Sequence, residues 1–69
     1  MKLSARNQIK GTVTVIKEGA VEAQVTLDIG GGQSVVSVIT MDSVANLGLK
    51  VGSKAYAVVK ADSVMIAVD

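Results

Sequence analysis

The chain has 69 residues, enough for one small domain spanning residues 1–69. Hydrophobic residues make up 49% of it, yet Tyr56 is its only aromatic residue and it has no Cys or His. Seven Lys and Arg residues against six Asp and Glu leave a net charge of +1. This composition excludes disulfides, Cys/His metal sites and a basic surface for duplex nucleic acid. Because no run of about 18 apolar residues and no signal-peptide pattern occurs, we expect a cytoplasmic protein without a membrane segment.

A chain of this size buries only about 60% of its unfolded surface, and its core is marginal without a further stabilising device. Disulfides and a zinc site are excluded here, and aliphatic side chains bury less area than aromatic ones. The sequence therefore predicts a homo-oligomer whose apolar faces continue into neighbouring copies.

Alternation of apolar and polar residues predicts the first two strands. Ile9, Val13 and Val15 share one face of a strand that begins at Ile9, with Gly11 in register between them. After a turn at residues 17–20, apolar residues alternate with polar ones over residues 21–29. A period of two with many β-branched residues is typical of strands.

Three glycines at 30–32 separate this strand from an apolar segment at 35–40. Their spacing does not match a phosphate-binding loop, which favours a hairpin tip instead. Because residues 35–40 are apolar on both faces, we expect a partner or a helix to cover the second face. A short helix is predicted over 41–47, capped by Thr40 or Asp42 and ended by Gly48.

Two further strands are predicted at residues 54–60 and 64–68, joined by a tight turn. Five strands with one helix between the third and fourth match an all-β, five-stranded barrel like that of oligonucleotide/oligosaccharide-binding (OB) folds. A single Tyr cannot form the stacking platform with which such barrels bind single strands, so we expect no nucleic-acid partner. Because His and Cys are absent and the carboxylates are scattered, we expect no enzyme.

Four places offer hydrogen-bond donors, and three of them also carry a Lys or Arg side chain. They are the block Ser4-Ala5-Arg6-Asn7, the helix start at Ser43, the Lys60-Ala61 corner and the turn at Lys17 and Gly19. Donors of this kind suit an oxyanion. Each place also has an ordinary interpretation: a solvated terminus, a capping hydroxyl or an edge lysine.

Three blocks in order resemble the molbindins, the small molybdenum-pterin-binding or Mop-type proteins. They are Ser-Ala-Arg-Asn-Gln at 4–8 with Lys-Gly at 10–11, Ile-Thr-Met-Asp-Ser-Val-Ala-Asn-Leu-Gly-Leu at 39–49, and Ala-Tyr-Ala-Val-Val-Lys-Ala-Asp-Ser-Val-Met at 55–65. The resemblance implies an OB-like barrel assembled as a hexamer, a trimer of dimers. It also implies molybdate or tungstate bound between subunits, for storage or homeostasis of molybdenum. The alternative is an oligomeric interaction or sensor module without that role.

The resemblance further implies the ligands of the main anion site. They are Ser4, Arg6, Asn7, Ser43, Lys60 and Ala61. A second anion site on a symmetry axis is implied at Gly19, Ala20 and Val21. The chain carries one copy of the module, which favours a free-standing binding protein over a regulator or an importer subunit.

Overall fold

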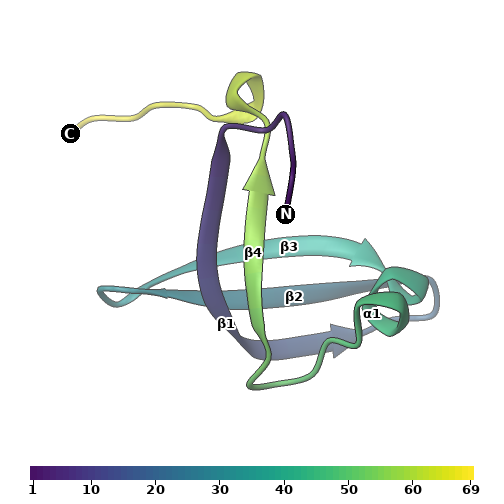
Figure 1. Ribbon diagram of the computed structural model, residues 1–69. Helices are drawn as coiled ribbons and strands as arrows, with labels where there is room; N and C mark the ends of the chain where they lie inside the picture. The colour runs from purple at the N-terminus through teal and green to yellow at the C-terminus, as the bar shows by residue number, and fades with distance from the viewer.

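A computed structural model describes all residues 1–69 and contains four strands, one α-helix and one 3-10 turn. In chain order they are β1 (Asn7–Glu18), β2 (Glu22–Gly30), β3 (Gln33–Thr40), α1 (Met41–Leu47), β4 (Lys54–Val59) and η1 (Ala61–Ser63). The strands form one antiparallel sheet in the order β3-β2-β1-β4 (Figure 1). The prediction of an all-β domain with one helix between the third and fourth strands is confirmed.

The sheet is curled because β1 serves two ladders. Its first half, Asn7–Thr12, pairs with β4, and its second half, Thr12–Glu18, pairs with β2. Near this bend a Cβ atom on Gly11 would lie 2.7 Å from the carbonyl oxygen of Asp28, so a side chain there would clash. The result is an upright arm of β1 and β4 standing on a layer of β2, β3 and α1 (Figure 1).

A β-bulge at Thr14 changes which face of β1 points inward. Val13 pairs with Leu27 but Val15 pairs with Thr26, so Thr14 is an extra residue. A one-residue insertion exchanges the two faces of a strand. Val15 is therefore 41% exposed, and Ile16 packs against the core in its place. The prediction that Val13 and Val15 share one face was wrong for this reason.

The core is small. Five apolar side chains are buried: Val13, Ala23, Val25, Leu27 and Val44. Three of them come from β2, whose strict alternation predicted this face correctly. On β3, Val36 and Val38 point away from the core and are exposed. The second apolar face predicted for this strand therefore exists and is uncovered in the single chain.

The punctuation of α1 follows the sequence. The Thr40 side chain accepts a hydrogen bond from the backbone N–H of Ser43 at 3.0 Å, so Thr40 rather than Asp42 is the N-cap. At the other end Gly48 is left-handed (φ 63°), and Leu49 N–H donates to the Val44 carbonyl at 3.1 Å. This is the Schellman ending, and it packs Leu49 and Val44 into the core together.

The predicted fifth strand is absent. After β4 the chain makes the 3-10 turn η1, and residues 64–69 then project sideways from the arm without pairing to any strand (Figure 1). The turn directs the chain away from both free sheet edges, so no strand lies alongside to supply hydrogen bonds. The prediction of five strands is corrected to four within one chain, and the sheet stays open between β3 and β4.

Candidate functional site

Pairing of β1 with β4 brings the two ends of the chain together. Asn7 lies opposite Val59, so the residues before β1 and those after β4 meet at the tip of the arm. They enclose a pocket of about 320 Å³ lined by Ser4, Ala5, Arg6, Lys60, Ala61 and Asp62. Two of the four places predicted from the sequence, at residues 4–7 and 60–61, thus form one site.

The Ser4–Arg6 wall is held by a local hydrogen bond that the sequence reading did not single out. The side-chain amide of Gln8 donates to the carbonyl of Ala5 at 2.9 Å, and Ala5 is half-buried while Ser4 and Arg6 are exposed. Arg6 has no carboxylate within ion-pair distance. Its guanidinium therefore keeps its donors available for a ligand.

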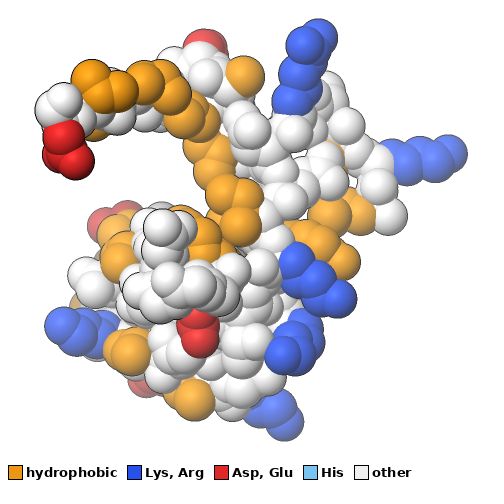
Figure 2. Space-filling model, turned by 90° about the vertical axis from the view of Figure 1, so that its left-hand side faces the viewer, with side chains coloured by type: hydrophobic (Ala, Val, Ile, Leu, Met, Phe, Trp, Pro, Cys, Tyr) orange, Lys and Arg blue, Asp and Glu red, His pale blue; other side chains and the backbone are white.

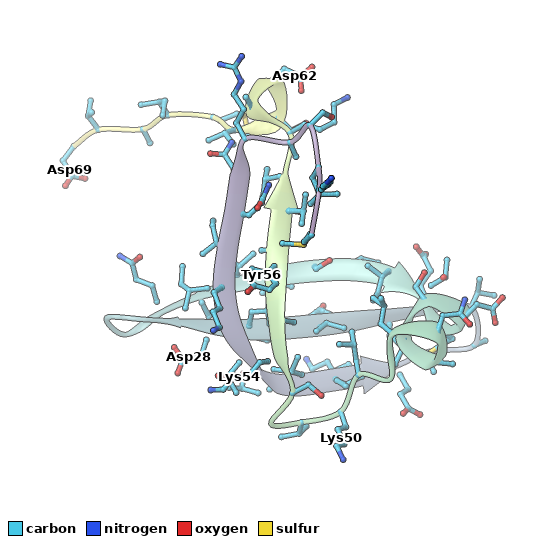
Figure 3. The ribbon with its side chains drawn as sticks, in the orientation of Figure 1. Asp28, Lys50, Lys54, Tyr56, Asp62 and Asp69 are labelled. Atoms are coloured by element: carbon cyan, nitrogen blue, oxygen red, sulfur yellow. The ribbon has the colours of Figure 1, made fainter.

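The opposite wall carries both signs of charge. Lys60 precedes η1, and the Asp62 carboxylate lies 4.0 Å from its Nζ atom (Figure 3 labels Asp62 at this turn). We had expected donors alone at this corner, and Asp62 adds an acceptor. Asp62 follows Lys60 by two residues in the sequence, but alternation of apolar and polar residues does not predict the 3-10 turn that brings its carboxylate back toward Lys60.

The other predicted main-site residues lie outside this pocket. Asn7 is half-buried as the first residue of β1 and does not line it. Ser43 lies on α1, at the far end of the molecule from the tip of the arm (Figure 1). There its hydroxyl accepts a hydrogen bond from Thr40 Oγ1 at 2.9 Å. Within one chain the Ser43 hydroxyl is thus bonded to the N-cap residue Thr40 and does not join Ser4, Arg6 and Lys60.

The residues proposed for a second anion site form the turn between β1 and β2. Gly19 N–H donates to the Glu22 carbonyl at 2.9 Å, and the Val21 carbonyl accepts from Met41 N–H at 2.8 Å. This places the turn, with Ala20 at its exposed tip, against the start of α1. Gly19, Ala20 and Val21 therefore lie in the same region as Ser43 and apart from the pocket at the arm.

No group of three or more His, Cys, Asp or Glu side chains is arranged to hold a metal ion. No helix has the length and hydropathy needed to cross a membrane. The pocket at the arm brings two cations, Arg6 and Lys60, together with one carboxylate, that of Asp62.

Comparison with known proteins agrees with the resemblance seen in the sequence. Residues 3–66 match the family model of the TOBE domain. The chain is 51% identical over 69 residues, all of both proteins, to a probable molybdenum-pterin-binding protein of Haemophilus influenzae. The chain belongs to the TOBE-domain family.

Two solved structures are similar as well. A molybdate-binding protein from Sporomusa ovata superposes with a TM-score of 0.90 at 42% identity, covering 97% of this chain and 98% of that one. The cytoplasmic molybdate-binding protein ModG, with molybdate bound, superposes with a TM-score of 0.84 at 52% identity. That match covers 88% of this chain and 43% of ModG. The fold is thus shared with proteins whose ligand is an oxyanion.

Proposed function

We propose that this protein binds molybdate, with tungstate as an analogue, and that the pocket at the tip of the arm supplies much of the site. The observation that carries the proposal is the convergence of Ser4, Arg6 and Lys60 on one pocket from opposite ends of the chain. The similarity to molybdate-binding proteins supports the choice of ligand. The role is one of binding and storage rather than catalysis.

The chemistry of these side chains suits the ligand. Molybdate is a tetrahedral dianion whose four oxygens only accept hydrogen bonds at neutral pH. Arg6 offers a planar fork of donors, Lys60 a mobile ammonium, Ser4 a rotating hydroxyl and Ala61 a backbone N–H. Two cations match the two negative charges of the ligand.

The pocket of one chain is wide and open to solvent. Its volume of about 320 Å³ is roughly ten times the volume that a water molecule occupies in the liquid, ~30 Å³. We infer that a neighbouring subunit closes it and contributes Ser43, with Asn7 at the edge. We infer that the same assembly brings the Gly19-Ala20-Val21 turns of several subunits together as a secondary anion site. The assembly that we propose to contain both kinds of site is a homo-hexamer built as a trimer of dimers.

The surface of the single chain supports assembly. Its accessible area is 5403 Å², whereas a folded monomer of 7.0 kDa exposes only about 4,000 Å². The excess of roughly 1,400 Å² is more than the ~800 Å² that one partner buries in a standard specific interface. Only six of 69 residues are buried. A stable fold therefore needs neighbours to cover apolar surface.

The largest apolar surface is the groove left open between β3 and β4. It has a volume of about 640 Å³, and 15 of its 17 lining residues are hydrophobic. Figure 2 shows hydrophobic side chains on the projecting C-terminal segment and on the surface beneath it. Ile66 of that segment is 86% exposed. We infer that residues 64–68 of one subunit lie in the groove of another and form there the fifth strand.

Calorimetric titration with molybdate, tungstate, sulfate and phosphate in parallel tests the function. We expect the first two to bind at least tenfold more tightly than the last two, and to raise the melting temperature by mass action. Sedimentation of the same samples reports the assembly. A folded hexamer without oxyanion preference would contradict molybdate binding and favour an interaction module. The cytoplasmic location of ModG supports the same location here.

A further inference from the structure

Asp62 is the one acidic residue that lines the pocket at the tip of the arm. Its carboxylate faces Lys60 Nζ at 4.0 Å, and both side chains are more than three-quarters exposed. Arg6, the other charged group of the pocket, has no such partner. In the single chain the pocket therefore holds one cation that is already paired and one that is free.

The contact is held by the backbone rather than by packing. The turn closes through hydrogen bonds from Ser63 N–H to the Lys60 carbonyl at 2.9 Å and from Val64 N–H to the Ala61 carbonyl at 3.3 Å. Lys60 has no side-chain cap bond to the turn. Because exposed ion pairs contribute little to stability, the Asp62 side chain can leave Lys60 without loss of the fold.

An anion that enters the pocket must compete with this carboxylate for Lys60. Coulomb attraction scales with the product of the charges, so a dianion attracts Lys60 about twice as strongly as a carboxylate does at equal distance. A monoanion such as chloride attracts it no more strongly than Asp62. The carboxylate therefore sets a minimum ligand charge.

Resting on the proposed function, we propose that Asp62 is a specificity-determining residue that acts as an internal competitor for Lys60. It excludes monoanions, which are the more abundant competitors in a salt solution, and yields to molybdate. The energetic cost of displacing Asp62 falls on every ligand, but only a dianion recovers it.

The test compares the wild type with Asp62→Asn by molybdate titration at low and at high potassium chloride. Asp62→Asn should bind molybdate roughly 2- to 5-fold more tightly than the wild type at low chloride, the scale of an exposed ion pair. It should lose that gain as chloride rises, while the wild type changes only by the general effect of ionic strength. Asp62→Glu should respond to chloride as the wild type does.

Asp28→Asn is the matched control, because it removes the same charge from a hairpin far from the pocket (Figure 3). Asn can still accept the hydrogen bond that Gly30 N–H donates to Asp28 Oδ1 at 2.9 Å. Equal behaviour of Asp62→Asn and Asp28→Asn, or weaker molybdate binding by Asp62→Asn, overturns the inference. Failure of the wild type itself to bind molybdate contradicts the proposed function instead.

Discussion

The pocket at the tip of the arm and the groove between β3 and β4 differ in the chemistry of their lining residues. The pocket at the tip of the arm is lined mainly by polar and charged residues and already contains two cations. The groove between β3 and β4 is lined almost entirely by hydrophobic residues and contains no strand to fill it. The first can bind a charged ligand, whereas the second exposes apolar side chains to water.

This difference separates specificity from stability. Charged side chains in the pocket are solvated in the single chain and lower its folding stability little, so the pocket can form without a ligand. Apolar side chains in the groove cost free energy as long as water covers them. In the proposed assembly the groove therefore supplies the driving force, and the pocket supplies the recognition of the ligand.

Removal of the guanidinium should have the largest effect, and it should act on the pocket alone. If Arg6 is a desolvated partner of the anion in the proposed assembled site, its loss costs about 2–5 kcal/mol. We expect Arg6→Ala to weaken molybdate binding by roughly 30-fold to several thousand-fold in calorimetry. The mass of the assembly should not change.

Lys50→Ala is the control for Arg6→Ala, because Lys50 lies at the opposite end of the molecule (Figure 3). It removes one positive charge without touching the pocket. Equal affinities of the two variants would exclude Arg6 as a ligand.

A charge in the C-terminal segment should act on the groove instead. If Ile66 lies in a neighbour's groove, Ile66→Asp places a carboxylate among aliphatic side chains, which costs on the order of several kcal/mol at each interface. Sedimentation should then show smaller species at micromolar concentration, with molybdate binding weakened as the interface is lost. Val51→Asp, at an exposed valine outside the groove, should leave the mass unchanged. An intact assembly of Ile66→Asp would show that something other than this segment covers the groove.

The corner of β1 joins the two regions, so damage there should affect both. A methyl group on Gly11 would lie 2.7 Å from the Asp28 carbonyl oxygen and 3.2 Å from Ile29 Cγ2. We expect Gly11→Ala to cost about 1–3 kcal/mol of unfolding free energy, since overpacking forces the backbone to shift. The melting temperature should fall by roughly 4–20 °C. Ser34→Ala, at an exposed position of β3, should leave the melting temperature nearly unchanged; an equally small effect of Gly11→Ala would mean that Gly11 is not sterically constrained.

The sequence predicted individual helices and strands well, but it predicted poorly how segments distant in the sequence lie relative to one another. Alternation identified β2, and a cap with a glycine identified α1, because both signals are confined to adjacent residues. The bulge at Thr14 and the turn at η1 depend on contacts with other strands, so the inward side of β1 and the path after Val59 were predicted wrongly. For the candidate site, residue types pointed to an oxyanion, but only the pairing of Asn7 with Val59 brought Arg6 and Lys60 together. Asp62 was missed for the same reason.

The smallest effect belongs to the hydroxyl that lies far from the pocket in its own chain. Ser43→Ala should weaken molybdate binding about 2- to 12-fold, the worth of one neutral hydrogen bond. The helix should keep its cap, because Thr40 still accepts from the backbone N–H of residue 43. Ser34→Ala, an exposed serine on β3, controls for the loss of a hydroxyl.

Mixed assemblies decide whether Ser43 and Arg6 of one site come from different subunits. In an equimolar mixture of Arg6→Ala and Ser43→Ala chains, about a quarter of the interface sites regain both wild-type residues if two copies share each site. Calorimetry should then resolve a fraction of sites with wild-type affinity that neither variant has alone. If both residues act from one chain, mixing restores none, and the pocket would have to close by a movement of α1 toward the arm. The mixing experiment therefore measures whether the polar pocket of one chain is completed by the Ser43 hydroxyl of another.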